Sequence, residues 1–479
     1  MKASMFRLSL IRPNDTTLRS SLPHSIITSV AAAEHAYSYL APSGLSEDGS
    51  LSLATSGGRS ANPHFFSGAI ARPRQVAQAL LVVSEIARTR FYTPPNMVAA
   101  AILAADPVVT SNVDRLRFES FSVCRGVYAR LDLEPEGLAG AFAEWGTTNV
   151  DFNPPMRAAL AGVRDEDGIL VNVGHDEVSV TTLQGSAFEK KVPLPDSWLK
   201  GFAEVQLASA AMLPYHELSA IEARRFLQSL PRSKGRGAAW ATPAGHGLRI
   251  SSRPDPRAVC VASPERLRLL ERLLPFTWAL RVFGPTASGV RGAEASGWEL
   301  ALDDARVTFV VSPELFRGFS GEGNVLGDLA GADDAEVEDV AESLHGEPSI
   351  DPEAIADATG VRVGGVQAAL SVLGAAGRVG FDLGRGTYFH RELPFERAAL
   401  EGMHPRLAGA RDLVAASAVA LDSGDSATVR SGDVAYLVRF TNAGATCTCP
   451  WFAKHRGARG PCKHVLAAEQ VRSGRPVTT

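Results

Sequence analysis

Two closely spaced pairs of metal-binding side chains constrain this chain most. Cys447 and Cys449 flank one threonine, and Cys462 and His464 follow twelve residues later with one lysine between them. Three thiolates and one imidazole make a complete tetrahedral ligand set for zinc. Side chains two apart in a strand point to the same face, so the first pair can present both sulfurs to one ion. The spacing therefore predicts one zinc ion bound by these four residues.

Neither chance clustering nor a disulfide accounts for these residues as well as zinc does. Ordinary buried side chains would rarely cluster in this way, because the chain has only five cysteines and eleven histidines in 479 residues. Cysteines separated by one residue rarely form a disulfide with each other, and nothing here resembles a secretory signal. Four protein ligands leave no open coordination position, which predicts a structural zinc site and not a catalytic one. We expect Cys462 at the start of a helix over residues 464–470.

A β-hairpin is predicted directly before the first cysteine pair. Residues 428–430 and 434–440 are rich in β-branched and aromatic side chains and flank a Ser-Gly-Asp turn. A hairpin followed by CxC, a spacer and CxH resembles the SWIM zinc finger. Segments 62–68 and 318–323 extend the resemblance to SWIM-containing proteins of high-GC bacteria, in which a long N-terminal region precedes the finger.

The resemblance has implications for fold and function. It implies a C-terminal ββα finger in a bacterial protein, with one structural zinc ion. SWIM fingers contact DNA or proteins, often beside ATP-driven machines, so the resemblance implies a partner such as a MoxR-type or Snf-type ATPase.

Length and composition describe an ordinary globular chain. Its 479 residues are too many for one hydrophobic core and predict about three domains. A formal net charge of −4 argues against polyanion binding by the whole chain, and no apolar run reaches the roughly twenty residues of a membrane span. Cys124 and Cys260 are expected to be buried structural residues. Unpaired thiols together with a thiolate metal site predict a reducing, cytoplasmic compartment. Without a long apolar run, no membrane partner is expected.

The fold class predicted is a multidomain α+β chain in four parts. Residues 1–60 form an N-terminal segment with a helix over 26–40 and a Ser/Gly-rich linker over 43–60. Residues 61–326 form a mixed α/β region of one or two subdomains, 327–395 a winged-helix-like domain, and 396–479 the finger domain. In the mixed region the patterns predict helices over 74–90, 217–230 and 264–274, and strands over 116–121, 127–133, 169–173, 178–182 and 306–311.

Residues 327–395 read as three helices and a hairpin, the order of a winged helix. The helices are predicted over 336–344, 352–357 and 363–373, and the hairpin strands over 378–382 and 387–390. The third helix offers only Gln367 for base contacts, with Arg362 at its start. Ten carboxylates lie between residues 333 and 357, and arginines 378, 385 and 391 in the hairpin offset them only in part. We therefore expect protein contact or packing, and not DNA reading, from this domain.

The finger region has the opposite charge. From residue 426 onward eight Lys and Arg side chains face two carboxylates, a formal charge of +6 that zinc with three thiolates lowers to about +5. The spacer over 454–460 is predicted to be a basic loop. Candidate partner contacts, to protein or to nucleic acid, are Trp451, Lys454, Arg456, Arg459 and Lys463. The alternative is a solvated loop whose aromatic residues pack under the zinc site.

No catalytic residues are predicted. Residues 284–291 have the glycine spacing of a phosphate loop, but Val-Arg replaces the required Lys-Ser/Thr. The preferred hypothesis is a cytoplasmic zinc-binding adaptor whose finger and winged helix contact mainly proteins. The alternative is a nucleic-acid-binding protein that uses the basic finger. A third hypothesis is an enzyme of unknown class in residues 61–326.

Overall fold

A computed structural model describes seventeen stretches of the chain. They are residues 44–45, 51–52, 64–91, 107–149, 152, 154–174, 177–182, 185–190, 196–233, 238–285, 294–313, 318–319, 333–344, 346–393, 405–441, 444–457 and 460–473. Helices and strands both occur throughout, and the strand pairs in the described stretches are antiparallel. The α+β class predicted from the sequence matches this mixed content. Residues 64–393 are called the body and residues 405–473 the finger.

Five strands of the body form one sheet in the order β11-β10-β9-β3-β7. Their bounds are β3 His64–Ile70, β7 Leu138–Phe142, β9 Leu170–Gly174, β10 Glu177–Thr182 and β11 Gly185–Lys190. Gly68 and Gly140 face each other across β3 and β7, where an added Cβ would come within 2.5 Å of the partner glycine. The two strands can approach this closely only because both residues lack a side chain.

Eight strands form the central sheet in the order β12-β16-β17-β18-β6-β5-β4-β8. Their bounds are β4 Val108–Ser111, β5 Leu116–Phe121, β6 Val127–Leu133, β8 Gly146–Asn149, β12 Met212–Ser219, β16 Ala279–Pro285, β17 Ser296–Leu302 and β18 Ala305–Val311. The helical elements beside it are α1 Pro73–Arg88, α3 Pro154–Ala161, α4 Asp196–Ala210, α5 Ala220–Ser229, and the 3₁₀ segments η2 Pro135–Gly137 and η3 Pro264–Leu273. Two small sheets complete this part: β1 Gly44–Leu45 with β2 Leu51–Ser52, and β14-β13-β15 with bounds Trp240–Ala244 (β13), Gly247–Ser251 (β14) and Val259–Cys260 (β15).

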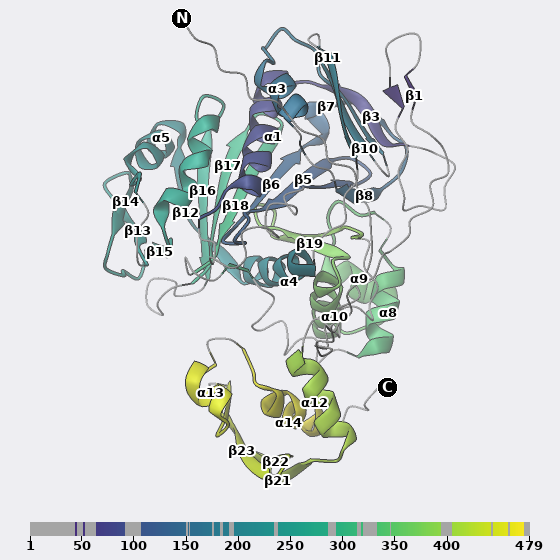
Figure 1. The fold of residues 1–479 in the computed structure, drawn as a ribbon, viewed down its shortest axis with the longest axis vertical. Helices are drawn as coiled ribbons and strands as arrows, with labels where there is room; N and C mark the ends of the chain where they lie inside the picture. Colours follow the sequence, from purple (N-terminus) through teal and green to yellow (C-terminus); the bar gives the residue numbers. More distant parts are fainter. Residues whose placement is uncertain are drawn as a thin grey trace, which may run out of the picture. The chain divides into compact units, whose positions relative to one another are not determined.

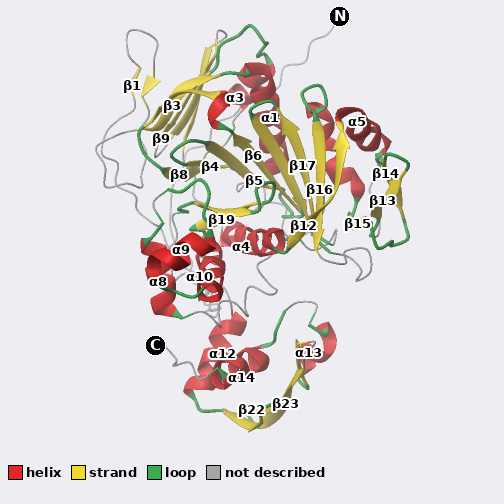
Figure 2. Cartoon of the chain, turned by 180° about the vertical axis from the view of Figure 1, so that it is seen from behind, coloured by secondary structure: helices red, strands yellow, loops and turns green. Residues whose placement is uncertain are grey.

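One face of the central sheet is apolar. Helix α1 packs on β5 and β6, and α5 packs on β12 and β16 (Figures 1 and 2). The segment η3 packs on both α1 and α5. Phe118, Leu131, Trp298, Leu300 and Val307 are at most 1% exposed in the largest core of the body. Burial of these side chains supplies the main favourable free energy of folding for the sheet.

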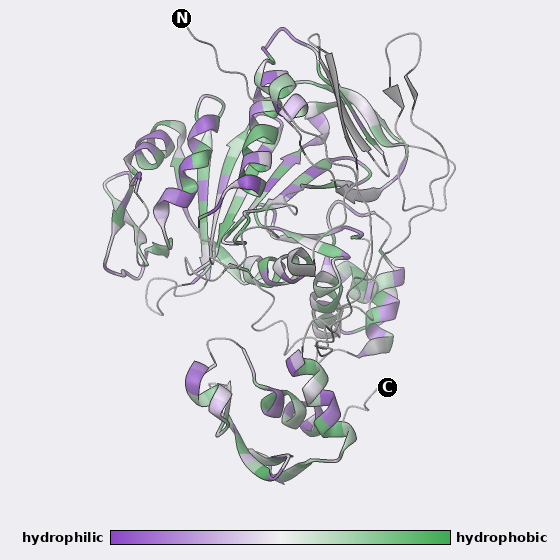
Figure 3. Cartoon of the chain, viewed as in Figure 1, coloured by the Kyte–Doolittle hydropathy of each residue, from purple (hydrophilic) through white to green (hydrophobic). Residues whose placement is uncertain are grey.

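The opposite face of the same sheet is charged and equally buried. Strand register sets Arg117 beside Asp132 and Glu119 beside Arg130, and all four side chains are at most 1% exposed. Figure 3 shows hydrophilic and hydrophobic segments along the strands of this sheet. A buried charge is stable only when it is paired and hydrogen-bonded. The partners of this face come from a segment 250 residues further along the chain.

That segment contains three helices and a hairpin, with bounds α8 Asp334–Glu342, α9 Pro352–Thr359, α10 Val363–Ala375, β19 Val379–Asp382 and β20 Thr387–His390. Asp333 and Asp351 cap α8 and α9 through side-chain bonds to backbone N–H groups. Gly360 ends α9 with a φ of +75°, a conformation that glycine adopts without strain. Ile350 forms an isolated bridge to Tyr388, next to the hairpin.

The hairpin closes the charged face through Asp382. This fully buried carboxylate accepts from Arg306 at 2.7 and 2.8 Å and from Arg130 at 3.1 Å. Glu119 accepts from Tyr128 and from Arg391 of the segment after β20, both at 2.6 Å. The hairpin is thus fixed to the sheet by ionic hydrogen bonds between side chains that are buried from water.

The finger has one helix, a four-stranded sheet and two further helices. Their bounds are α12 Pro405–Ala415, β21 Val419–Ser423, β22 Ser426–Ser431, β23 Val434–Thr441, β24 Gly444–Cys447, α13 Pro450–His455 and α14 Lys463–Arg472. The sheet order is β21-β22-β23-β24, and α12 and α14 pack on each other and on the sheet. Leu407, Val438, Leu466 and Ala467 are at most 3% exposed in its separate core.

Most predicted elements occur, but the structure corrects two predicted helices and the predicted setting of three residues. The helix predicted over 217–230 begins at Ala220, because residues 217–219 pair with β16 and Ser219 with Glu222 forms a capping box. The segment over 264–274 is a 3₁₀ helix. Cys124 is only partly buried, although Cys260 is buried as expected. Lys454 lies in α13 and not in a loop, and Arg391 is 2% exposed, so neither matches its predicted setting.

Some predictions fall outside the described stretches. The helix over 26–40 lies outside the described residues, as does most of the linker over 43–60, of which only the paired strands β1 and β2 are described. The four domain boundaries stay a prediction. None of the helices in the described stretches is long and apolar enough to cross a bilayer.

We expect the Asp382→Asn substitution to lower the free energy of unfolding of the body by about 3–5 kcal/mol at neutral pH. It removes a buried carboxylate that pairs with both Arg130 and Arg306, so among the described residues Arg130 keeps only Asp132 as an ion-pair partner, and Arg306 loses its shortest ion pair. Chemical denaturation followed by circular dichroism would measure the loss. Asp433→Asn, at an exposed turn of the finger, is the matched control and should change stability by less than about 0.5 kcal/mol.

The same variant should have a weaker dependence of stability on pH. Burial alone would raise the pKa of Asp382, but Arg130, Arg306 and Arg117 outweigh it and hold the pKa well below its ordinary value of 3.8. The unfolded chain therefore takes up this proton first as the pH falls, so the stabilisation is complete above about pH 4 and is lost below it. Equal acid sensitivity of the variant and the wild type would contradict this role for Asp382.

Candidate metal centre

The four predicted ligands come from the ends of three elements. Cys447 is the last residue of β24, Cys449 is the N-cap of α13, Cys462 is the N-cap of α14, and His464 is in the first turn of α14. Pro450 opens α13 and cannot continue the strand. The chain therefore turns at both ligand pairs, and each turn directs its side chains toward the cluster.

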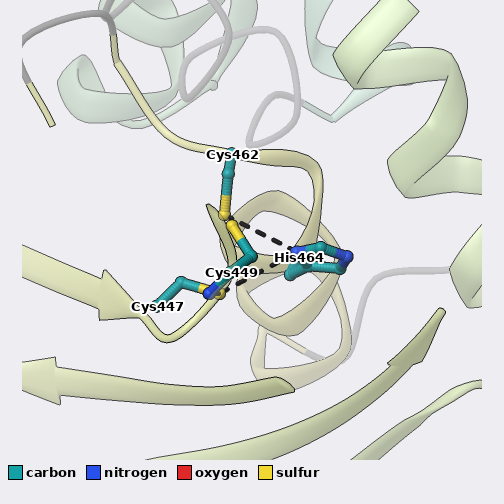
Figure 4. Close-up of side chains that lie close together, drawn as sticks. All are labelled: Cys447, Cys449, Cys462 and His464. Carbon is teal, nitrogen blue, oxygen red and sulfur yellow. Dashed lines mark hydrogen bonds between the residues drawn. The ribbon is translucent and has the colours of Figure 1, made fainter. Parts of the chain in front are cut away.

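The structure brings all four side chains together. Their candidate ligand atoms lie within 4.8 Å of one another, and His464 Nδ1 is 3.8 Å from Cys447 Sγ and 4.0 Å from Cys462 Sγ (Figure 4). Zinc bonds of about 2.0–2.3 Å place neighbouring ligand atoms of a tetrahedron roughly 3.5–3.8 Å apart. The cluster is slightly wider than this and has the full Cys₃His donor set, so the residues present fit a zinc ion.

Burial makes the centre a closed one. Cys449 and Cys462 are 2% exposed, His464 5% and Cys447 8%, so a bound ion would have little access to solvent. A catalytic zinc keeps one position for water or substrate, whereas four protein ligands fill the shell. When bound, zinc would supply cross-linking and charge neutralisation. It would connect β24 and α13 to the start of α14.

The thiols influence one another strongly. Hydrogen bonding from Cys447 lowers the pKa of the Cys462 thiol to about 4, while the same bond raises the pKa of Cys447. Burial raises the pKa of Cys449. Three adjacent thiolates therefore do not form together without a cation, which zinc provides because it binds the deprotonated form.

Backbone and aromatic groups support the ligands. The Cys449 N–H lies 3.5 Å from Cys447 Sγ, and the Phe452 N–H lies 3.4 Å from Cys449 Sγ. Such N–H donors stabilise sulfur that carries negative charge. The Tyr436 ring lies 4.4 Å from the His464 ring, so the imidazole is held between the sulfur cluster and an aromatic side chain of β23.

One residue that supports the centre was not predicted from the sequence. Arg406 of α12 donates to the Pro461 carbonyl at 2.7 Å, and its guanidinium lies 4.5 Å from the centre of the Trp451 ring. It therefore connects α12 to the segments that precede and follow the spacer. No local motif marks this arginine. The apolar spacing of Leu407, Ala410 and Leu413 indicates only that α12 packs on the core.

The predicted contact residues have different settings. Trp451 is half-buried against the finger core and stacks with Arg406, which agrees with the packing alternative. Lys454 and Arg456 are exposed, and Lys463 is partly exposed with its stem against Gly409. Arg459 lies outside the described residues.

Two further arginines on the finger sheet were also not predicted as contacts. Arg430 and Arg439 are exposed on the side of β22 and β23 that faces away from Val429 and Val438 of the core. Within the part of the finger that the structure describes, Arg430, Arg439, Lys454, Arg456 and Lys463 form no ion pair. These five side chains are called the basic set. Their charge is available to a partner.

We expect purified protein to contain one zinc ion per chain and the Cys449→Ser variant to lose it. Structural zinc contributes on the order of 10 kcal/mol of apparent binding free energy, so its loss should unfold the finger while the body stays folded. Elemental analysis would measure zinc, and hydrogen exchange would compare protection in residues 405–473 and 64–393. Cys124→Ser, the same change outside the centre, should retain zinc. Full zinc occupancy in Cys449→Ser would rule out the assigned ligand set.

Comparison with known proteins agrees with the geometry at the finger. The family model described as SWIM zinc finger matches residues 436–473, which include all four ligands. No curated protein matches the chain.

Two solved structures of proliferating cellular nuclear antigen (PCNA) resemble about half of the chain. Proliferating cellular nuclear antigen from Entamoeba histolytica has 10% identity and a TM-score of 0.32, over 52% of this chain and 98% of that one. The A. fulgidus PCNA bound to a C-terminal region of FEN-1 has 9% identity and a TM-score of 0.33, over 52% and 97%. Likeness at this level assigns no function to the body. The family match and the buried Cys₃His cluster together identify residues 436–473 as a SWIM zinc finger.

Proposed function

We propose that this protein is a zinc-containing adaptor that binds a protein partner through its finger. The observation that carries the proposal is the combination of a closed metal centre with a basic set that has no internal counter-charge within the described residues. A closed centre favours a structural role for the metal, and unpaired cations at a surface favour an acidic partner. An ATPase, as the family resemblance implies, would be such a partner, and a reducing compartment suits the free thiols.

We interpret the segment from α8 to β20 as a winged helix that serves packing. The order α8, Ile350 bridge, α9, α10 and hairpin supports this interpretation. A winged helix that reads DNA needs its third helix and its wing at the surface. Here Gln206 of α4 donates to Leu370 of α10 and residues 371–375 are buried, so the C-terminal half of the third helix is covered, while Arg362 and Gln367 nearer its start are exposed.

The charge of this segment supports the same proposal. Exposed carboxylates on α8 and α9, including Glu338, Asp339 and Asp357, form no ion pair within the described residues. They would repel a phosphate backbone. Contact with DNA through this segment is therefore disfavoured by its charge.

Nucleic-acid binding by the finger is the second candidate function. It is favoured by the basic set, because unpaired Arg and Lys side chains attract phosphates as well as carboxylates. The two candidates differ in whether the protein binds generic DNA and in how that binding responds to salt.

We expect the full-length protein not to bind a generic 30-base-pair duplex at low salt, as measured by fluorescence anisotropy. If it does bind, the logarithm of the affinity should fall steeply with that of the salt concentration, and Lys454→Ala with Arg456→Ala should reduce the slope by about 2. That result would replace the adaptor proposal by the nucleic-acid alternative. Arg249→Ala with Arg253→Ala removes two exposed charges from the body and is the matched control.

A further inference from the structure

A recess lies where the hairpin tip meets the central sheet. Its volume is about 370 Å³, the lower end of the range for ligand pockets. Its walls come from the start of β16, the β17–β18 turn, the segment after β6 and the β19–β20 turn. Its lining includes Glu134, Glu136, Trp278, Arg281, Asp304 and Arg385.

Trp278 forms an apolar wall of this recess. Its residue is 50% exposed, and it is the one aromatic among the exposed large apolar residues of the described stretches. The indole N–H donates to the Leu302 carbonyl at 3.1 Å, and the backbone N–H donates to Ala301 at 3.0 Å. A ring held in this way can accept an apolar group without further loss of side-chain freedom.

Two arginines present oriented donors to the same recess. Arg281 is 5.6 Å from the centre of the Trp278 ring and is held by Glu217 and Glu299 at 3.3 and 3.2 Å. Arg385 donates to Glu134 at 2.7 Å. These side chains are 30% and 43% exposed, and each guanidinium has five N–H groups, of which these bonds use one or two. The remaining donors can bind a carboxylate in a fixed geometry.

Carboxylates in the recess select against highly charged anions. Glu136 is exposed and has no ion-pair partner among the described residues, and Asp304 is 3.7 Å from Arg72. Both would repel a phosphate, which offers only acceptors and up to two negative charges. The end of a protein chain carries one negative charge beside backbone N–H groups, and these can donate hydrogen bonds to Glu136.

We propose that this recess binds the free C-terminal carboxylate of a partner chain whose last side chain is apolar. The carboxylate accepts hydrogen bonds from Arg281 and Arg385, and the last side chain packs on Trp278. The site belongs to the body and is independent of the finger. It goes beyond the proposed function because it adds a second contact with a defined chemical target.

The test uses zinc-loaded full-length protein and fluorescein-labelled hexapeptides. Peptides ending in Leu, Phe, Glu or Lys are compared as free acids and as C-terminal amides by fluorescence anisotropy. We expect saturable binding of the Leu and Phe acids, and roughly tenfold weaker binding of their amides, since a charge-assisted hydrogen bond is lost. Trp278→Ala and Arg385→Gln should each weaken binding by about tenfold.

Controls separate this site from the finger and from a loss of folding. Leu213→Ala and Arg249→Gln, exposed residues outside the recess, should bind as the wild type does, and so should the zinc-free Cys449→Ser variant. If Arg385→Gln disturbs the fold, the comparison of acid with amide and the Trp278→Ala variant decide the question. The proposal is overturned if no acid peptide binds, if amides bind equally well, or if inorganic phosphate displaces the peptide.

Discussion

A buried network of guanidinium and carboxylate groups joins the central sheet of the body to the β19–β20 hairpin and the segment that follows it. Asp382 from the hairpin meets Arg130 and Arg306 of the sheet, while Arg391 from the segment after β20 meets Glu119. A charge removed from water is destabilising by several kcal/mol unless its partners are in place. If the hairpin separated from the sheet, these charged groups would be exposed to water or left buried without a partner of opposite charge. The position of α8–α10, the burial of Asp382 and Leu383 and the walls of the recess all depend on this constraint.

The sequence predicted the metal centre better than it predicted the body. The four ligands lie within eighteen residues, so their spacing alone specifies which side chains can meet. Strands β5 and β6 were predicted with correct bounds because apolar residues alternate with other types. The same alternation is normally typical of a strand with one face in water. Here Arg117 and Arg130 point to a buried face, because Asp382 covers them from 250 residues away. No local pattern contains that partner.

Tertiary context also explains the smaller errors. Residues 217–219 have helical neighbours in sequence, but pairing with β16 and the capping box at Ser219 fix the boundary three residues later. Arg391 was counted among charges that offset an acidic surface, whereas Glu119 and Phe202 enclose it. In both cases the deciding contact comes from a distant element. The metal centre shows the reverse, since its four ligands are close together in the sequence, whereas Arg406, which supports the centre from outside the motif, was missed.

The body and the finger are stabilised by different chemistry, and this matters for an adaptor. The body has its counter-charges internally, in Asp132, Glu299 and Asp382, so its buried arginines add nothing to its surface field. The finger has a small hydrophobic core, so coordination of the metal, which cross-links neighbouring segments, supplies stability that a larger domain obtains from its core. Its basic side chains are therefore not needed for internal ion pairs. A small domain stabilised by a metal can keep an unpaired charged surface, and that surface is the part of this protein best suited to recognise a partner.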